Sequence, residues 1–343
     1  MQSKVLISHK KNIRLDFLNV PDLLDEYSLL KIISAPFSFQ EKLFIENNDL
    51  DYPYIPGTEA IGLIEKIGEK SRFLSYGMEG LKKGDLIYIE PSIICGNVQC
   101  KTCLQGAYST CEDGMTYGRN DINIYPYLLG TLSEYMVILP GSKVHRISSE
   151  IPIYNLNLIG LISKAIRSIS KKGNGIIGDN LIILGLDLFS LCCAIIANYI
   201  GMNRITILDD YFNSSGKKIL GELNINFTEK LPEEKFDLII DNKGNHELLK
   251  QAINLAKPEA KILVPFNFAT NDITFSRNII IEKELSFIGV SRPSWDVEQA
   301  IKFISNNESL LKKIPYKEYN LDDFLIINKN IKEIKLLNVS IRP

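Results

Sequence analysis

The chain has 343 residues, of which 45% are hydrophobic, and its formal net charge at pH 7 is −2. This length and composition predict two domains, and the near balance of charge argues against nucleic acid or an anionic membrane as a partner. The first ten residues lack the apolar run of a signal peptide, and no apolar stretch is long enough to span a bilayer. We therefore expect a cytoplasmic protein in a reducing environment.

The first 155 residues predict short β-strands separated by turns. Gly57, Gly68 and Gly84 mark turns between apolar segments rich in Ile, Val and Leu. The predicted strands are residues 4–8, 29–34, 60–67, 85–90 and 135–139. This pattern, with few helices, is typical of a partly open β-barrel.

Four cysteines lie within seventeen residues, at Cys95, Cys100, Cys103 and Cys111. Thiolates at such short separations can converge on one tetrahedral Zn²⁺, and a site closed by four sulfurs is structural because no position is left for water or substrate. Two disulfides or four unrelated thiols are the alternative. A reducing compartment favours the metal, so we predict one structural zinc in a lobe formed by residues 95–111.

From residue 156 the pattern changes to alternating helices and strands. Residues 180–185 form an apolar run without alternation, as a buried parallel strand requires. Further strands are predicted at 204–209, 236–241, 260–265 and 285–290, and helices at 156–170, 188–200, 246–256 and 297–304. This alternation predicts an α/β domain with a doubly wound parallel sheet over residues 156–290, and residues 291–343 return to the first domain.

Several segments together carry a resemblance to a known family. They are residues 52–62, Gly84-Asp85, the cysteine lobe, residues 130–135, the strand at 181–185 and residues 282–292. The chain resembles the medium-chain, zinc-type alcohol dehydrogenase superfamily. The resemblance implies a GroES-like barrel domain with a Rossmann domain, dehydrogenase activity on a small-molecule substrate with NAD(H), and a homodimer that pairs through the edge strand at 285–290.

The chain departs from this family at the catalytic zinc. Ser38 stands where the resemblance implies a cysteine ligand, and Thr58 replaces the histidine of a Gly-His-Glu triplet. Glu59 remains, with Glu41 as the one further acid near it, and residues 158–162 supply no cysteine, histidine or acid. Neutral hydroxyls are poor zinc ligands beside thiolate and imidazole, so we expect no catalytic zinc. In the lobe, four residues rather than the family's two separate Cys95 from Cys100, which a loop tolerates.

The expected dinucleotide fingerprint, Gly-x-Gly-x-x-Gly, is also altered. Gly185 can make the tight turn and Ser190 is small enough for close packing, but Asp187 replaces the second glycine. At ~5 Å from one phosphate charge, with an effective dielectric constant of ~20, a carboxylate costs on the order of 3 kcal/mol. Asp209 ends the second strand, where an acid would bind the adenosine ribose of NAD and repel the extra phosphate of NADP; alternatively, it only solvates a strand end.

Two functions remain open on these residues. In the first, the chain is an oxidoreductase without catalytic zinc that acts on a small polar, polyol-like, sugar-like or specialised-metabolite substrate. Ser38 and Thr58 would hold the substrate carbonyl, Glu59 would relay a proton, and Arg292 would bind a phosphate or carboxylate of the substrate unless it is an ordinary surface arginine. In the second, the chain is a non-redox descendant: a binding or scaffold protein, or a lyase or isomerase.

Overall fold

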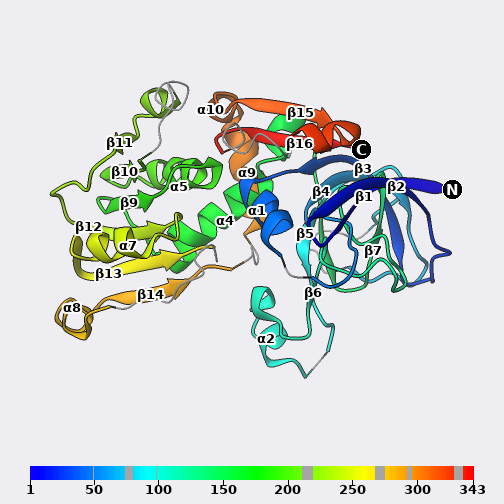
Figure 1. Ribbon diagram of the computed structural model, residues 1–343, viewed down its shortest axis with the longest axis horizontal. Helices are drawn as coiled ribbons and strands as arrows, with labels where there is room; N and C mark the ends of the chain where they lie inside the picture. The colour runs from blue at the N-terminus through cyan, green and yellow to red at the C-terminus, as the bar shows by residue number, and fades with distance from the viewer. Residues whose placement is uncertain are drawn as a thin grey trace. The chain divides into compact units, whose positions relative to one another are not determined.

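The computed structural model describes residues 1–48, 50–73, 80–97, 99–210, 219–266, 275–291, 296–327 and 335–343. The chain forms two compact units: unit 1 comprises residues 1–160 and 301–343, and unit 2 comprises residues 161–300 (Figure 1). Each boundary falls inside a helix, α4 (Ile159–Ile166) or α9 (Val297–Asn306). The sequence pattern places these transitions after residues 155 and 290, whereas the two units divide after residues 160 and 300. Hydrophobic periodicity does not mark where a helix passes from one unit to the next.

Unit 1 contains a curled sheet to which both ends of the chain contribute. Its order is β15-β16-β3-β4-β5-β6, with β7 paired to β3 and β8 paired to β5. The strands are β3 (Ser28–Pro36), β4 (Ala60–Lys66), β5 (Leu86–Ile93), β6 (Met115–Thr116), β7 (Tyr135–Ile138), β8 (Ser142–Arg146), β15 (Tyr316–Asn320) and β16 (Asn338–Arg342). Ser340 of β16 lies opposite Pro36 of β3, so the C-terminal segment completes the N-terminal domain. The predicted barrel-like domain is confirmed.

Short elements surround this sheet. Strands β1 (Gln2–His9) and β2 (Asn12–Asn19) form a separate antiparallel pair. The helices are α1 (Phe39–Asn47), α2 (Lys101–Leu104), α3 (Ile153–Leu156), α10 (Glu308–Leu311) and α11 (Phe324–Ile327), with 3₁₀ turns η1 (Tyr108–Thr110) and η3 (Leu321–Asp323). Phe37 meets Phe324 edge to face in the buried core, at 5.1 Å between ring centroids. This contact anchors the segment that precedes α1.

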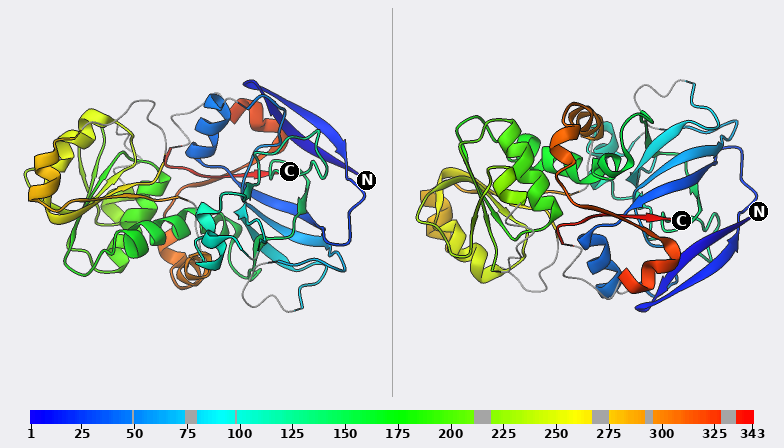
Figure 2. Two further views of the ribbon diagram at one scale, coloured as in Figure 1. Left: turned by 90° about the horizontal axis from the view of Figure 1, so that it is seen from below. Right: turned by 90° about the horizontal axis from the view of Figure 1, so that it is seen from above.

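Unit 2 is a six-stranded parallel sheet in the order β11-β10-β9-β12-β13-β14. The strands are β9 (Asn180–Leu184), β10 (Arg204–Leu208), β11 (Asn226–Thr228), β12 (Phe236–Asp241), β13 (Ala256–Val264) and β14 (Ser286–Gly289). The helical segments are α5 (Leu188–Tyr199), α7 (His246–Ile253), α8 (Arg277–Glu282) and the π-helical turn η2 (Arg167–Lys172). Figure 2 shows helices on both sides of the sheet. This is the predicted doubly wound fold, with the strand order of dinucleotide-binding domains.

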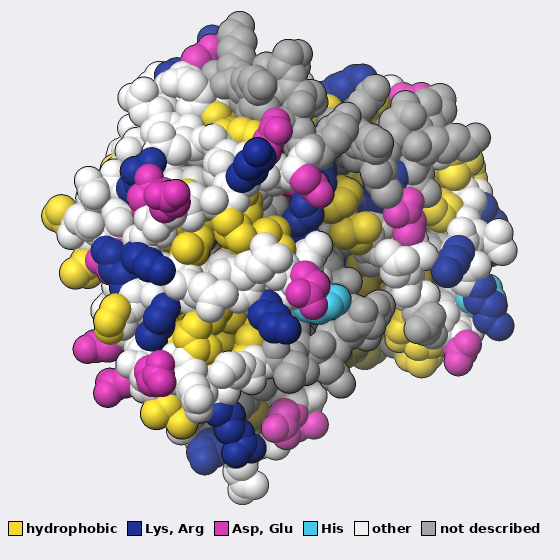
Figure 3. All heavy atoms as spheres, turned by 60° about the vertical axis from the view of Figure 1, so that its left-hand side comes forward, with side chains coloured by type: hydrophobic (Ala, Val, Ile, Leu, Met, Phe, Trp, Pro, Cys, Tyr) yellow, Lys and Arg dark blue, Asp and Glu magenta, His cyan; other side chains and the backbone are white. Residues whose placement is uncertain are grey.

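The buried residues are those that the apolar runs of the sequence predicted, and the surface charges are mixed. All four residues from Leu181 to Leu184 in β9 are fully buried, as a central parallel strand requires. Cys192 and Cys193 are also fully buried on α5, where burial raises the pKa of both thiols, so they pack as small apolar side chains. On the face in Figure 3, basic and acidic side chains are interspersed. Within the described residues, no helix combines the length and apolar character needed to cross a bilayer.

Candidate functional site

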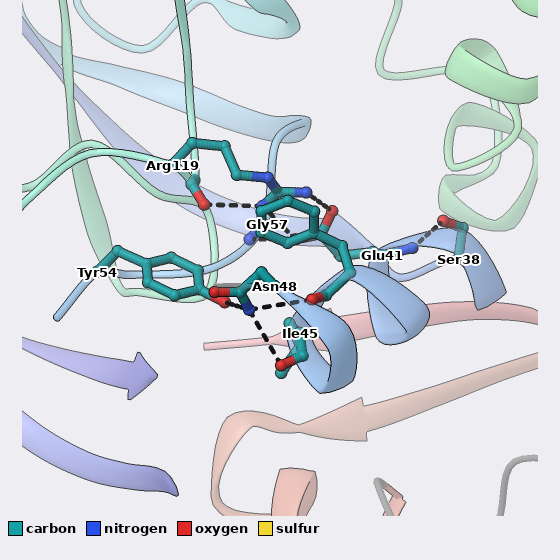
Figure 4. A network of polar contacts seen from close by, with 9 residues as sticks. Ser38, Glu41, Ile45, Asn48, Tyr54, Gly57 and Arg119 are labelled. Carbon is teal, nitrogen blue, oxygen red and sulfur yellow. Dashed lines mark hydrogen bonds and ion pairs between the residues drawn. The ribbon is translucent and has the colours of Figure 1, made fainter. Parts of the chain in front are cut away.

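A partly buried ion pair holds the segment that contains Thr58 and Glu59. Arg119 donates to both carboxylate oxygens of Glu41, at 2.9 and 2.7 Å, and its guanidinium carbon lies 3.4 Å from the centre of the Phe44 ring. Glu41 in turn accepts a hydrogen bond from the backbone N–H of Gly57 at 2.9 Å (Figure 4). Because both oxygens of Glu41 are engaged in this way, Glu41 acts as a clamp on the Gly57 segment rather than as an available metal ligand.

Ser38 begins the helix that carries this clamp. Its hydroxyl oxygen accepts a hydrogen bond from the backbone N–H of Glu41 at 3.1 Å, which makes Ser38 the N-cap of α1. Ser38, Thr58 and Glu59 are half-buried. The clamp therefore connects the two predicted segments through one residue, since Glu41 contacts Ser38 through its main chain and Gly57 through its side chain.

The carboxylate of Glu59 lies against the backbone of Gly160, at the start of α4. A Cβ atom added to Gly160 would come within 1.9 Å of Glu59 Oε2. Glu59 also lies near the fully buried Tyr88 of β5. Burial first, and then the charges of Glu59 and Glu90, raise the pKa of Tyr88 well above its ordinary value. The half-buried Glu59 carboxylate therefore lies between a glycine backbone and a buried tyrosine.

These donors do not fit a catalytic zinc. Ser38 and Thr58 supply neutral hydroxyls, Glu59 supplies the one carboxylate, and Gly160 supplies no side chain at all. Among the described residues, the one group of three or more histidine, cysteine or acidic side chains suited to a metal is the cysteine lobe. Zinc sites in enzymes use three protein ligands from thiolates, imidazoles and carboxylates, and this set falls short of that requirement.

A buried charged cluster that the sequence analysis missed lies next to Tyr88. Glu90 of β5 accepts from Lys143 Nζ at 2.6 Å and pairs with His145 Nε2 at 2.8 Å, both on β8. The side chains of Glu90, Lys143 and His145 are 1%, 4% and 10% exposed, so the three must be read as one unit. The alternation of Tyr88 and Glu90 on one strand and Lys143 and His145 on the next was the available signal, because such residues share one face.

The four lobe cysteines converge. Their sulfur atoms all lie within 4.8 Å of one another, with Cys103–Cys111 at 3.5 Å and Cys95–Cys103 at 3.9 Å. These separations fit a tetrahedron of sulfurs around zinc, whose edge is about 3.8 Å for Zn–S bonds of about 2.3 Å. All four are free thiols, and a hydrogen bond with Thr102 lowers the pKa of Cys100 to about 6. Cys95 reaches the cluster in spite of the longer spacing.

The predicted nucleotide residues meet at the carboxyl ends of β9 and β10. Gly185 adopts a φ of +98°, which favours glycine, and Asp187 is the N-cap of α5. Ser190 Oγ donates to the Gly185 carbonyl at 2.6 Å and accepts from Asn242 Nδ2 at 2.7 Å. Gly185, Asp187 and Ser190 therefore lie together in one short loop, which these hydrogen bonds hold.

Asp209, at the end of β10, contacts the same loop. Its carboxylate is 1% exposed, accepts from the backbone N–H of Leu186 at 2.7 Å and pairs with Lys243 Nζ at 3.0 Å. Lys243 Nζ also contacts Asp210 at 2.6 Å. The pyrophosphate of a dinucleotide would meet Asp187 in this loop, and the arrangement does not fit it. Arg292 lies outside the described residues.

Comparisons with known proteins agree with this architecture. Residues 30–149 match the family model of the alcohol dehydrogenase GroES-like domain. The L-threonine 3-dehydrogenase of Pyrococcus horikoshii is 23% identical over 256 residues, which cover 71% of this chain and 68% of that protein. The probable D-xylulose reductase A of Aspergillus fumigatus is 24% identical over 317 residues, covering 86% of this chain and 84% of that protein.

Solved structures share the whole fold. An alcohol dehydrogenase from Thermotoga maritima superposes with a TM-score of 0.87 at 19% identity, over 100% of both chains. Galactitol-1-phosphate dehydrogenase from Escherichia coli gives a TM-score of 0.77 at 21% identity, over 99% of this chain and 100% of that one. The architecture is thus that of a GroES-like domain joined to a Rossmann domain. The sequence and structural neighbours are thus medium-chain, zinc-type alcohol dehydrogenases, the family that the sequence resembles.

Proposed function

We propose that this chain is a medium-chain oxidoreductase that works without a catalytic zinc on a small polar, polyol-like, sugar-like or specialised-metabolite substrate. The similar L-threonine 3-dehydrogenase and D-xylulose reductase are named for polar, hydroxyl-bearing substrates. The observation that carries the proposal is the set Ser38, Thr58 and Glu59, held near the Glu41–Arg119 ion pair. This set offers two hydroxyl groups and one half-buried carboxylate, which suit a hydroxyl- or carbonyl-bearing ligand.

In the proposed mechanism, proton transfer rests on residues of this chain alone. The hydroxyls of Ser38 and Thr58 orient the substrate oxygen by hydrogen bonds, and Glu59 accepts or returns the proton of that oxygen. Without a metal to polarise it, a simple ketone loses several kcal/mol of transition-state stabilisation, so the substrate must itself be activated. Oxidation or reduction of the substrate would also require a hydride carrier, and the fingerprint loop does not fit the pyrophosphate of a nicotinamide dinucleotide.

That same loop favours a second candidate, a non-redox descendant. Proton transfer by Glu59 requires no hydride carrier. An isomerase or lyase step, or binding without turnover, is therefore compatible with the repulsion between the Asp187 carboxylate and the pyrophosphate of a dinucleotide. The two candidates differ in one requirement. The oxidoreductase needs NAD(H) or another hydride carrier, and the non-redox protein does not.

The experiment that separates them is a screen of the purified full chain against polyols, sugars and hydroxy amino acids, with and without NAD(H), followed by product analysis. The oxidoreductase predicts turnover that depends on the cofactor. Glu59→Gln should then lower kcat by about 10²–10⁴-fold, and Ser38→Ala and Thr58→Val should weaken substrate binding. Turnover that is unchanged when the dinucleotide is left out would support the second candidate instead.

We also propose that Cys95, Cys100, Cys103 and Cys111 bind one structural Zn²⁺. Four sulfur ligands leave no open position, so this metal would fix the lobe and take no part in the reaction. Metal analysis of the purified protein should give about one zinc per chain. Cys103→Ser should abolish it, while Cys192→Ala, a buried cysteine outside the lobe, should retain it. Retention of zinc in the Cys103→Ser variant would contradict the assignment.

Two further expectations belong to this proposal. The chain acts in a reducing cytoplasm, where the lobe thiols remain available to metal. It also pairs as a homodimer through β14, which ends the order of the sheet in unit 2. Light scattering of the purified protein should give twice the chain mass of 38.8 kDa. A Phe287→Lys substitution in β14 should reduce the measured mass to that of one chain.

A further inference from the structure

The N-terminus of α5 is the position in unit 2 at which a diphosphate would bind. β9 ends at Leu184, Gly185 turns the chain, and α5 begins at Leu188. At this position in a Rossmann domain, unpaired backbone N–H groups and the positive end of the helix dipole attract a pyrophosphate. The position therefore needs open N–H groups and no negative charge nearby if it is to bind a diphosphate.

In this chain a carboxylate of the protein lies at that position. Asp187 Oδ1 accepts a hydrogen bond from the backbone N–H of Ser190 at 2.8 Å, and the Asp187 residue is 3% exposed. It therefore satisfies one of the N–H groups at the start of α5 and brings a negative charge to the positive end of the helix. We infer that Asp187 is a built-in replacement for the pyrophosphate, so the native chain binds dinucleotides and other diphosphates only weakly.

The surrounding contacts keep Asp187 where it is. Ser190, which supplies the N–H, is itself held by Gly185 and Asn242 through its hydroxyl. On the other side, Asp209 holds the backbone N–H of Leu186. A diphosphate would have to displace the Asp187 carboxylate from its hydrogen bond or bind beside it. The oxidoreductase proposed above would therefore bind NAD(H) only weakly, whereas the non-redox candidate would be unaffected.

The size of the effect follows from the charge. One phosphate charge at ~5 Å from the carboxylate, with an effective dielectric constant of ~20, corresponds to an affinity lower on the order of a hundredfold. The penalty applies to ADP and NADH, which carry phosphates, and not to adenosine, which has none. The ligand class that this chain selects against is therefore defined by the phosphate and not by the adenine.

The test is calorimetric titration of the full chain with ADP, NADH and adenosine. Asp187→Gly removes both charge and side chain, and glycine replaces an N-cap aspartate at a cost of only a few tenths of a kcal/mol. We expect it to bind ADP and NADH on the order of a hundredfold more tightly than the native chain, with adenosine unchanged. Asp187→Asn keeps an oxygen to cap α5 but removes the charge, so it should show a smaller gain in the same two ligands.

The matched control is Asp210→Asn. Asp210 lies at the same edge of the sheet, but its side chain is 80% exposed, so solvent and salt screen its charge and its removal should change ADP affinity by no more than a few-fold. Micromolar binding of ADP or NADH by the native chain would overturn the inference. Equal gains in affinity for adenosine and ADP would also overturn it. So would an unchanged ADP affinity in Asp187→Gly protein whose thermal unfolding midpoint matches that of the native chain. The native comparison of ADP with adenosine decides the matter even if the variants do not fold.

Discussion

The carboxylate of Glu59 occupies the space that a side chain at Gly160 would need, since a Cβ added there would lie 1.9 Å from Glu59 Oε2. Residue 160 lies in the segment where the family resemblance implied a further zinc ligand. In this chain Gly160 leaves space for the Glu59 carboxylate and supplies no zinc ligand. The two residues are therefore coupled, and a change at one is felt at the other.

Gly160→Ala should displace Glu59 with little effect on the fold. The atom that an added methyl group meets is the far end of a flexible side chain, which can rotate away, so we expect the free energy of unfolding to fall by at most about 1 kcal/mol. Turnover of the accepted substrate should fall much further, because the proton-transferring group has moved. Gly221→Ala is the control, since a Cβ there meets nothing within 4 Å. Unchanged turnover in Gly160→Ala protein would refute the role given to Glu59.

Arg119→Ala should destabilise unit 1. Glu41 is 8% exposed and would lose both of its guanidinium contacts, and leaving such a charge unpaired costs about 3 kcal/mol. Arg119→Lys should recover only part of this, because an ammonium group cannot pair with both oxygens in a planar arrangement. Lys70→Ala is the control, since the Lys70–Asp25 pair is exposed and should contribute less than about 1 kcal/mol. Urea unfolding of the three variants measures the differences.

The Glu90–Lys143 pair should tolerate joint replacement better than single replacement. Glu90→Ala leaves the Lys143 ammonium, 4% exposed, without its carboxylate, and we expect a loss of about 3–5 kcal/mol in the free energy of unfolding. The double variant Glu90→Leu with Lys143→Met removes both charges and should be at least about 2 kcal/mol more stable than Glu90→Ala. Urea unfolding monitored by circular dichroism distinguishes these outcomes. If the single and double changes lower the free energy of unfolding equally, the contact between Glu90 and His145, and not the Glu90–Lys143 pair, accounts for the stability of the cluster.

Asp241→Asn should stabilise the protein at neutral pH. Burial raises the pKa of Asp241, although the N–H groups of Gly244 and Lys243 partly oppose this. An acid whose pKa is raised by folding favours the folded state below its unfolded pKa of about 3.9, and this contribution is lost as the pH rises through the folded value. Asparagine keeps an acceptor oxygen without the charge. The variant should therefore unfold at higher urea than the native chain at pH 7, with no advantage at pH 3. Asp16→Asn is the control, because the Asp16 side chain is 46% exposed.

Much of the architecture could be predicted because it is written in local patterns. The unbroken apolar run that became β9, the apolar segments that became β3 and β4, and the glycine after β9 each specify a local conformation. The short spacing of Cys95, Cys100, Cys103 and Cys111 likewise brings the sulfurs together with little help from the rest of the fold. The C-terminal strands β15 and β16 were less clear, because β16 pairs with β3, which lies some three hundred residues earlier in the chain, and β15 pairs with β16.

The sequence alone determined which chemical groups this protein has lost and kept: Ser38 and Thr58 in place of strong zinc ligands, Asp187 in place of a glycine, and an intact set of lobe cysteines. Only the tertiary structure decided what those groups contact. It paired Glu41 with Arg119, set Glu59 against Gly160 and paired Asp209 with Lys243. The physical reason is that residue identity fixes charge and hydrogen-bonding capacity, whereas the partners of a buried polar group come from distant segments that only packing brings together.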